Sequence, residues 1–209
     1  MSAVLIHPAR STRKPKGEGH ARRAEILTAA EQIFVEHGYE GATIRKIADA
    51  VGLSSTALYM HFPDKGAILH EICRNAFERL REGQDQIIAA DTPPETRLRG
   101  LLEAYIDFGF ANPNAYRLIY LTRPDEAQHA QTVAQEVGIE LFRAFEIVVE
   151  EAEAKGMLRS GAHVTARALW AGVHGVVSLM ITKPYFDWPT REQLSKTMLD
   201  ALFAGLLKP

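Results

Sequence analysis

The stretch from Thr43 to Lys65, TIRKIADAVGLSSTALYMHFPDK, constrains the possible folds more than any other part of the sequence. Apolar residues recur at helical spacing from Ile44 to Val51, and Thr43 precedes them with a hydroxyl that can cap a helix. Gly52 then stands where a chain leaves a helix in a left-handed conformation, which costs glycine little. Ser54 offers a cap for a second helix. The pattern predicts a helix-turn-helix, in which two short helices are joined by a tight turn.

The second of these helices, Ser54 to Met60, has an unusual outer face. With Ala57 and Leu58 on the inner face, the outward side chains are those of Ser55, Thr56, Tyr59 and His61. A purely structural surface helix more often exposes Glu, Lys or Arg. Hydroxyl, phenol and imidazole groups can approach base edges and phosphates closely, which suits a helix that enters the major groove of DNA at its N-terminal end.

A third helix is expected to begin at Lys65, with Asp64 as its cap. A cation at the start of a helix opposes the helix dipole, so Lys65 is not favoured there for helix stability. A bound phosphate would compensate the charge, because helix N-termini attract anions. Lys65 is therefore a candidate phosphate contact.

Eighteen residues between Ala24 and Leu69 together form a spaced sequence pattern. They are Ala24, Glu25, Ile26, Leu27, Phe34, Gly38, Tyr39, Thr43, Ile47, Ala48, Gly52, Leu58, Tyr59, His61, Phe62, Asp64, Lys65 and Leu69. Together they resemble the DNA-binding domain of the TetR family of one-component transcriptional regulators, over about the first third of the chain. Met60 departs from the pattern, because the family often has an aromatic residue there. The resemblance implies DNA contacts at Thr43, Lys46, Ser55, Thr56, Tyr59, His61 and Lys65.

Charge is distributed unevenly along the chain. The formal net charge is −2, but residues 1–23 carry six basic side chains against one acidic one, a local charge of +5. Glycine, serine and proline are interspersed, so residues 1–19 are expected to form a flexible basic arm. The arm either reaches a phosphate backbone or minor groove, or only solubilises the chain. The basic residues are Arg10, Arg13, Lys14, Lys16, Arg22 and Arg23.

The periodicity of the whole chain predicts an all-α fold, an N-terminal three-helix helix-turn-helix head on a larger C-terminal helical bundle. The head is expected at 20–65, a connecting helix at 66–90 and the ligand-binding and dimerisation bundle at 91–209. Thr92 is expected to cap the first body helix, before two prolines. One rigid connecting helix would carry a rearrangement of the body to the head. The body helices are expected at Glu95 to Ala111, Asn114 to Leu121, Asp125 to Lys155, Val164 to Thr182 and Arg191 to Leu207.

Two later phrases extend the resemblance over most of the chain. They are Asn112 to Leu118, NPNAYRL, and Trp170 to Gly175, WAGVHG. Both are similar to the body domain of a TetR subgroup that is marked by a Trp and His-Gly signature. This likeness implies a C-terminal domain that binds a small-molecule effector and forms a homodimer, but it identifies no effector.

Aromatic residues concentrate in the body. Rings with polar tips can line a cavity and orient a partly apolar small molecule. For each residue the alternative is ordinary core packing, so the prediction rests on the group and on the resemblance. The predicted ligand-binding residues are Tyr105, Phe108, Tyr116, Tyr120, Phe142, Phe145, Trp170 and His174.

His174 shares a helical stripe with Trp170, so the two side chains are expected to point the same way. Either His174 contacts the effector, or it packs and satisfies itself on a neighbouring group, as buried histidines usually do. No pair of His or Cys residues has the spacing of a metal site, although His163, His174 and Asp187 can meet in space. We expect no metal and no cofactor.

Small residues mark one face of the helix expected at 164–182. Glycine inside a helix costs about 1 kcal/mol, so two glycines need a packing reason. The last helix also carries more apolar surface than its own body needs. Pairing of both helices with their two-fold copies would give a four-helix interface, and packing within one chain is the alternative. The predicted interface residues are Ala168, Gly172, Gly175, Leu179, Leu199, Leu202, Phe203 and Leu206.

The remaining features bound the setting of the protein. Cys73 is the single cysteine, which excludes a disulfide framework, and the N-terminus lacks the apolar core of a signal peptide. The longest apolar run, Ala168 to Thr182, is shorter than the ~20 residues of a bilayer span. We expect a cytoplasmic protein without a membrane segment.

The expected function is that of a dimeric, ligand-responsive regulator, a repressor that a small molecule releases from a palindromic operator in double-stranded DNA. A transcriptional activator of the same family is the alternative. A small all-helical enzyme that uses Cys73 or His174 would need a base, an orienting group and an oxyanion site, none of which is close in sequence, so no enzymatic activity is expected. A helical scaffold whose head has lost DNA affinity is a third possibility.

Overall fold

The computed structural model describes residues 19–120 and 128–208, and four basic residues of the predicted arm, Arg10, Arg13, Lys14 and Lys16, lie outside this part. Over the described residues the chain is α-helical, with a single isolated β-bridge between Leu158 and Leu207. The predicted all-α class is confirmed. The helices are α1 (Gly19–Gly41), α2 (Ile44–Ala50), α3 (Ser55–Tyr59), α4 (Lys65–Ile88), α5 (Pro94–Ala111), α6 (Pro113–Tyr120), α7 (Gln128–Ala154), α8 (Ala162–Thr182) and α9 (Arg191–Leu206).

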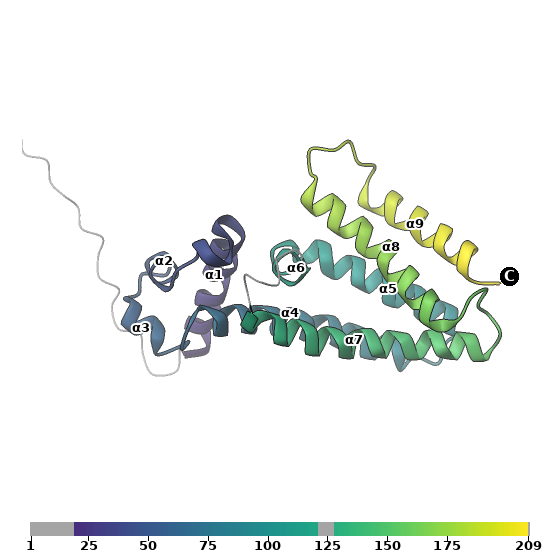
Figure 1. Ribbon diagram of the computed structural model, residues 1–209, viewed down its shortest axis with the longest axis horizontal. Helices are drawn as coiled ribbons and strands as arrows, with labels where there is room; N and C mark the ends of the chain where they lie inside the picture. The colour runs from purple at the N-terminus through teal and green to yellow at the C-terminus, as the bar shows by residue number, and fades with distance from the viewer. Residues whose placement is uncertain (1–18, 121–127, 209) are drawn as a thin grey trace, which may run out of the picture.

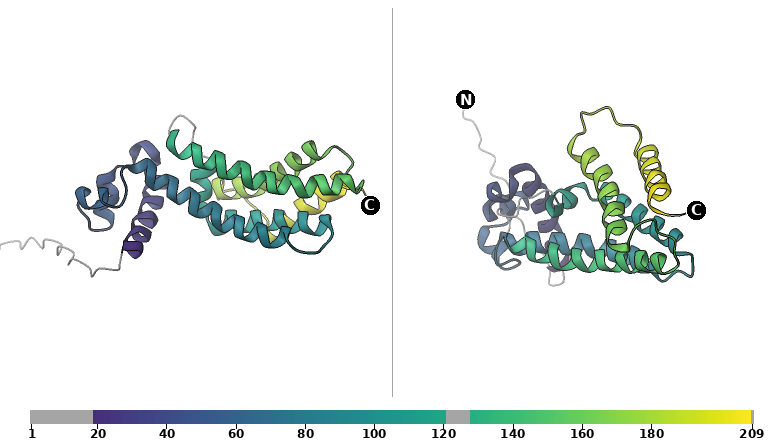
Figure 2. Two further views of the ribbon diagram at one scale, coloured as in Figure 1. Left: turned by 90° about the horizontal axis from the view of Figure 1, so that it is seen from below. Right: turned by 45° about the vertical axis from the view of Figure 1, so that its right-hand side comes forward.

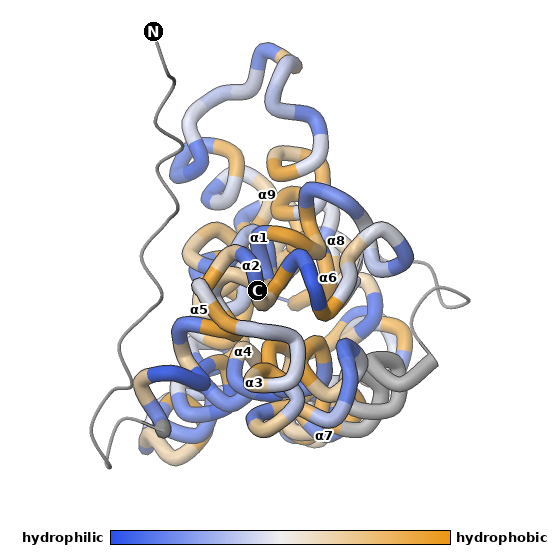
Figure 3. The backbone as a smooth tube through the Cα atoms, turned by 90° about the vertical axis from the view of Figure 1, so that its left-hand side faces the viewer, coloured by the Kyte–Doolittle hydropathy of each residue, from blue (hydrophilic) through white to orange (hydrophobic). Residues whose placement is uncertain are grey.

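Figure 1 shows a small head, formed by α1, α2 and α3, at one end of a longer helical body. Helix α4 belongs to both parts, because it starts beside α3 and then runs along the body next to α7 (Figure 1, Figure 2). Helix α5 packs against α4, α7 and α8, and α9 packs on α8. Figure 3, which looks at the molecule from the head end, shows hydrophobic and hydrophilic residues alternating along the helices, as amphipathic helices require.

Two hydrophobic cores divide the molecule, and α4 contributes to both. The head core includes the segment of α4 from Ile68 to Cys73, and the body core begins on the same helix at Ala76. By packing, the head therefore extends beyond residue 65, where the sequence predicted its end. Leu118 of α6 also lies in the head core, and Ile119 packs against both cores. Within the described residues, helices α4 and α6 thus link the head to the body.

The turn chemistry that the sequence predicts is present in the head. Thr43, Ser54 and Asp64 each accept a hydrogen bond from a backbone N–H group three residues on, at 3.2, 3.1 and 2.7 Å, and so cap α2, α3 and α4. Gly52 has a φ of 66° between α2 and α3, and Gly38, with a φ of 70°, kinks α1 near its end. These left-handed conformations favour glycine.

The start of α5 differs from the prediction. The N-cap residue is Pro93, which offers no side-chain oxygen, and Thr92 lies outside the helix. The physical reason is that Pro93 itself precedes a proline, and a residue before proline is driven out of the helical region. Pro93 accordingly has an extended ψ of 147° and occupies the N-cap position.

Helix α8 begins at Ala162 and is therefore longer than the apolar run from Ala168 to Thr182, whose length argued against a membrane span. It spans 21 residues, and among the described helices it is the one that is long and apolar enough, by length and composition, to cross a membrane. Its inner face, which includes Leu169, Val173 and Val177, is buried in the body core. A core helix of a globular protein has the same composition.

Candidate functional sites

The outer face of α3 carries side chains that the head does not use for its own packing. Leu58 anchors the helix and is fully buried. Thr56 and Tyr59 lie on the outside, where 53% of Tyr59 is exposed. Within the described residues, no hydrogen bond or ring contact holds the Tyr59 phenol. Helix α3 therefore presents free polar groups from a rigid, capped position.

The predicted phosphate contacts lie at the start and in the middle of α2, after α3 and at the start of α4, and two of them have partners within the head. The Lys46 ammonium donates a hydrogen bond to the carbonyl of Gly41 at 2.8 Å. The Lys65 ammonium donates to the carbonyl of Tyr39 at 2.8 Å and lies 4.1 Å from the centroid of the Tyr39 ring. Lys65 therefore joins α4 to the end of α1, a stabilising role that the helix-dipole argument did not predict. Of the other members of the set, Thr43 is exposed and His61 is half-buried.

Two residues that the sequence analysis counted with the basic arm belong to the head. Arg22 lies in α1 and pairs with Glu25 at 2.6 Å. Arg23 forms an ion pair with Glu71 of α4, and its guanidinium lies 4.2 Å from the centroid of the Phe62 ring. Both guanidinium groups have partners inside the chain, because both residues lie in α1, within the range of 20–65 expected for the head.

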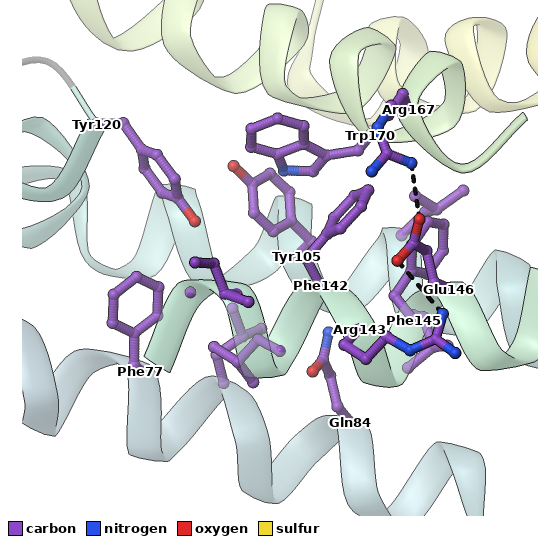
Figure 4. Close-up of a pocket in the computed structure, with 16 residues that line it drawn as sticks. Phe77, Gln84, Tyr105, Tyr120, Phe142, Arg143, Phe145, Glu146, Arg167 and Trp170 are labelled. Carbon is purple, nitrogen blue, oxygen red and sulfur yellow. Dashed lines mark hydrogen bonds and ion pairs between the residues drawn. The ribbon is translucent and has the colours of Figure 1, made fainter. Parts of the chain in front are cut away.

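A cavity of about 500 Å³ lies in the body, within the size range of small-molecule sites (Figure 4). Its wall is mostly aliphatic and aromatic, and helices α4, α5, α6, α7 and α8 all contribute to it. The lining residues are Phe77, Leu80, Gln84, Leu101, Leu102, Tyr105, Tyr120, Gly138, Ile139, Leu141, Phe142, Arg143, Phe145, Glu146, Arg167 and Trp170.

The structure divides the predicted ligand-binding residues in two. Those on the cavity wall are Tyr105, Tyr120, Phe142, Phe145 and Trp170. Those that do not line this cavity are Phe108, Tyr116 and His174, for which ligand contact stays a prediction. Phe108 and Tyr116 are buried in the body core. His174 follows Trp170 by one helical turn, and this step along α8 takes its side chain past the cavity.

Polar side chains from α5, α6 and α8 form a hydrogen-bonded cluster, in which Tyr105 lines the cavity and Tyr116 and His174 do not. The Tyr116 hydroxyl lies 2.6 Å from Nδ1 of His174, and the Tyr105 hydroxyl lies 3.0 Å from the same nitrogen. Burial lowers the pKa of His174, which keeps the imidazole neutral and Nδ1 able to accept. Burial also raises the pKa of Tyr105 and Tyr116, so both phenols stay protonated. The cluster satisfies its own polar groups.

The polar residues of the cavity were missed by the sequence analysis. Gln84 is 6% exposed and lines the cavity, and its Oε1 atom has no hydrogen-bond partner among the described residues. Elsewhere on the wall, Glu146 pairs with Arg167 at 2.7 Å and with Arg143 at 3.5 Å (Figure 4). The hydrogen bond from Arg167 and the pair with Arg143 hold the pKa of Glu146 below its ordinary value. One signal was readable, because Gln84 follows Leu80 by four residues and so shares its inward face.

Comparison with known proteins identifies both parts of the chain. A family model for bacterial regulatory proteins of the tetR family matches residues 26–72, and a model for the tetracyclin repressor-like C-terminal domain matches residues 98–202. The chain belongs to the TetR family. It is a DNA-binding transcriptional regulator, as the sequence predicted.

Individual relatives of this TetR-family chain include regulators of both signs. The transcriptional activator FasR of Mycolicibacterium smegmatis is 31% identical over 156 residues, which cover 67% of this chain and 70% of FasR. The transcriptional repressor KstR2 of Mycobacterium tuberculosis is 34% identical over 112 residues, which cover 54% of this chain and 54% of KstR2. The solved structure of KstR2, a ketosteroid transcriptional regulator, has a TM-score of 0.72 at 23% identity, and the match covers 90% of this chain and 96% of that one. The likeness to that structure shows a shared fold.

The predicted dimer residues of this TetR-family chain do not all face outward. Leu199 and Phe203 are buried in the core of their own body. A Cβ atom at Gly172 would lie 2.7 Å from Leu202, so this glycine allows α8 and α9 to pack closely within one chain. By contrast, Gly175 has no neighbour within 4 Å of a Cβ position, and Leu179 is 48% exposed. The interface prediction is therefore corrected for the residues that α8 and α9 use against each other.

The residues considered for other activities have structural surroundings in this TetR-family fold. Cys73 lies in the head core, and burial raises the pKa of its thiol to about 12, which keeps it protonated near neutral pH. The His174 imidazole is engaged by two tyrosines. Among the described residues, His163, His174 and Asp187 included, no group of three or more His, Cys, Asp or Glu side chains is arranged to hold a metal ion.

Proposed function

We propose that this TetR-family chain acts in the cytoplasm as a homodimeric repressor that a small molecule releases from a palindromic operator. In this proposal, the two heads bind adjacent major grooves, and an effector in each body cavity favours a spacing of the heads that no longer fits the DNA. The observation that carries the proposal is the outer face of α3, where Thr56 and Tyr59 are exposed and the Tyr59 phenol has no partner in the described chain.

The proposed DNA contacts fall into two classes. Ser55, Thr56 and Tyr59 lie on or at the end of α3 and are assigned to bases or sugars. Phosphate contacts are assigned to Thr43, Lys46, His61 and Lys65, which stand around the two helices. The lysines keep donors free beyond the single hydrogen bond that each makes within the head, since an ammonium group has three.

Dimerisation is proposed through the outer faces of α8 and α9. Support comes from Gly175 and Leu179, which leave a small and an apolar position open on α8, and from the exposed Ala201 on α9. A Leu179→Glu variant should be monomeric in sedimentation velocity at micromolar concentration, because the charge would be buried in the interface. Ile147→Glu is the matched control, since Ile147 is 50% exposed on α7. A Leu179→Glu dimer as tight as wild type would contradict the proposed interface.

The route from effector to DNA is proposed to run through α4 and α6. Phe77 and Leu80 of α4 line the cavity, and the same helix supplies the head core up to Cys73. Tyr120 of α6 also lines the cavity, while Leu118 of the same helix lies in the head core. A molecule that moves either helix therefore acts on the head by direct packing.

An unbiased operator selection tests the proposed function. The full-length protein would be incubated with random duplex DNA, and the bound sequences would be enriched and measured by gel shift. We expect inverted repeats with half-sites about one helical turn apart, ~34 Å, and binding that weakens as salt concentration rises. Enrichment of no common sequence would overturn the proposal, and enrichment of a single unrepeated half-site would overturn its dimeric form.

Activation is the second candidate function, and the relative FasR favours it because it is named an activator. DNA binding alone does not separate the two signs of regulation. A reporter gene placed behind the selected operator, with and without the regulator, would separate them. Reduced expression supports repression, and increased expression supports activation.

A further inference from the structure

Gln84 is a buried polar side chain without a partner on the wall of the body cavity. It lies on α4, it is 6% exposed, and its Oε1 atom has no hydrogen-bond partner among the described residues. Figure 4 shows its amide pointing from α4 towards the aromatic side chains of the cavity. An unpaired buried amide is unfavourable, so a molecule that supplies the missing donor gains more there than a hydrogen bond in water would give.

The charges on the cavity wall are already balanced. Arg167 pairs with Glu146 at 2.7 Å, and Arg143 pairs with Glu150 at 2.5 Å. Among the described lining residues these arginines are the only cations. An anionic guest would have to break one of these pairs or remain uncompensated beside apolar walls, which is costly.

The shape of the cavity sets the form of the guest. Phe77, Leu80 and Gln84 all face it from α4, so it extends for about 10 Å along this helix, at 1.5 Å per residue. Aromatic and aliphatic side chains of α5 and α7 also line the cavity. The space suits an extended apolar body with a polar group at the level of Gln84.

We propose that the effector is an elongated, uncharged, mostly apolar molecule whose hydroxyl or N–H group donates a hydrogen bond to Oε1 of Gln84, once the amide turns about its last side-chain bond to bring this buried oxygen to the cavity. The inference rests on the proposed function, because it takes the cavity as the effector site. Gln84 then makes the cavity prefer molecules that carry a hydrogen-bond donor over hydrocarbons, ethers and carboxylates of the same length.

Three probes of equal chain length test this selection. They are 1-decanol, which donates a hydrogen bond, methyl nonyl ether, which has the same number of non-hydrogen atoms but no donor, and decanoate, which is anionic at pH 7. Binding to the full-length protein without DNA would be followed by tryptophan fluorescence. Trp170 lines the cavity, whereas Trp188 lies in the segment between α8 and α9.

We expect wild-type protein to bind 1-decanol about tenfold more tightly than the ether, the effect of one hydrogen bond to an otherwise unpaired buried group. Decanoate should bind no more tightly than the ether. In Gln84→Met, which keeps the length of the side chain and removes the amide, 1-decanol and the ether should bind within about twofold of each other. The matched control is Gln86→Met, because Gln86 is exposed on the same helix and the variant should keep the tenfold preference.

A thermal melt of the ligand-free variants separates ligand recognition from a structural role. Gln84→Met should melt at the same or a higher temperature than wild type, because it removes an unpaired buried amide. Unfolding at a lower temperature together with an unchanged preference for 1-decanol would overturn the inference and make Gln84 a structural residue. Equal binding of 1-decanol and the ether to wild type, or tightest binding of decanoate, would also overturn it.

Failure of the proposed function gives a different result. If none of the three probes changes the tryptophan emission of wild type, the cavity is not a ligand site, and both the inference and the effector part of the proposed function fail. If the probes bind without discrimination, only the inference fails. Operator binding in the absence of probes reports on the head independently of either result.

Discussion

The head and the body of this regulator use their polar residues in opposite ways. On the head, the polar groups of α3 lie outside, and the exposed Tyr59 phenol makes no hydrogen bond or ring contact within the described chain. In the body, Tyr105 on the cavity wall, Tyr116 and His174 satisfy one another by hydrogen bonds. Substitutions on α3 should therefore change binding and leave folding intact, whereas substitutions in the body should change folding first.

The largest expected effect is the loss of operator binding in Tyr59→Ala. A phenol that contacts bases or sugars contributes about 1–3 kcal/mol, so operator affinity should fall by about 5- to 150-fold in a gel shift. The melting temperature should not change, because Tyr59 is 53% exposed and is not needed for the head core. Tyr185→Ala is the control, since Tyr185 is also an exposed tyrosine, at 78%, and lies outside the head in the segment between α8 and α9. Wild-type affinity in Tyr59→Ala would remove α3 from the DNA interface.

Gly109→Ala should give the opposite result in the body. A Cβ atom at Gly109 would lie 2.4 Å from Val177 and 3.2 Å from the Tyr116 ring, so the methyl group overfills the contact of α5 with α8 and α6. We expect the free energy of unfolding to fall by about 1–3 kcal/mol in urea denaturation.

The control for this packing effect is Gly83→Ala on α4, where a Cβ atom meets nothing within 4 Å. Because alanine favours a helix interior over glycine, this variant should unfold with a free energy that is unchanged or about 1 kcal/mol higher. Equal stability of both variants would show that the body tolerates an overfilled contact and would weaken the contrast with the head.

The same contrast explains what the sequence could predict. The head depends on caps and turns within a few residues of one another, such as Thr43, Gly52, Ser54 and Asp64, and each of these local signals is present as predicted. The cavity depends on which of many apolar faces meet across five helices. Periodicity places Trp170 and His174 on one stripe, but it does not say where along that stripe the cavity ends.

Long-range contacts account for the other errors. Gly172 could be read as a site of close helix approach, but the sequence did not say whether the approaching helix belonged to the same chain, and in the structure Leu202 of α9 fills that place. The sequence indicates that the positive charge of Lys65 is unfavourable at the start of its own helix. The carbonyl of Tyr39, which accepts a hydrogen bond from this ammonium group, belongs to a residue 26 positions away. A local pattern shows that a residue is unusual at its position, whereas the tertiary fold determines which distant residue it contacts.

Lys65 provides a more demanding test of the comparison, because it combines both roles in the head. Lys65→Met should lower operator affinity and also the free energy of unfolding by about 1 kcal/mol, through loss of the bond to Tyr39 and of the contact with its ring. Lys46→Met, which loses an exposed bond to the Gly41 carbonyl and no ring contact, should lower the free energy of unfolding less than Lys65→Met and reduce the slope of affinity against salt concentration by about one. Gel shifts at several salt concentrations and urea denaturation measure both. A fully stable Lys65→Met variant would mean that the contacts of Lys65 with Tyr39 add nothing to folding.

The smallest expected effect is a pH dependence that belongs to the body. Burial lowers the pKa of His174 in the folded protein below the ordinary value of about 6.5 that applies to the unfolded chain. Between these two pKa values the unfolded chain binds a proton that the folded chain does not, so the free energy of unfolding should fall as pH drops below about 6.5. For a single group the slope cannot exceed about 1.4 kcal/mol per pH unit.

Urea denaturation of wild type and His174→Asn at pH 7.5, 6.5 and 5.5 measures this contribution. The variant should lose less stability than wild type on acidification, because asparagine offers Tyr116 an acceptor that does not titrate. His163→Asn should behave like wild type, since His163 is exposed on the same helix and lies outside the cluster. If His174→Asn loses as much stability as wild type, protonation of His174 does not oppose folding, and the body cluster would be as open to water as the outer face of α3.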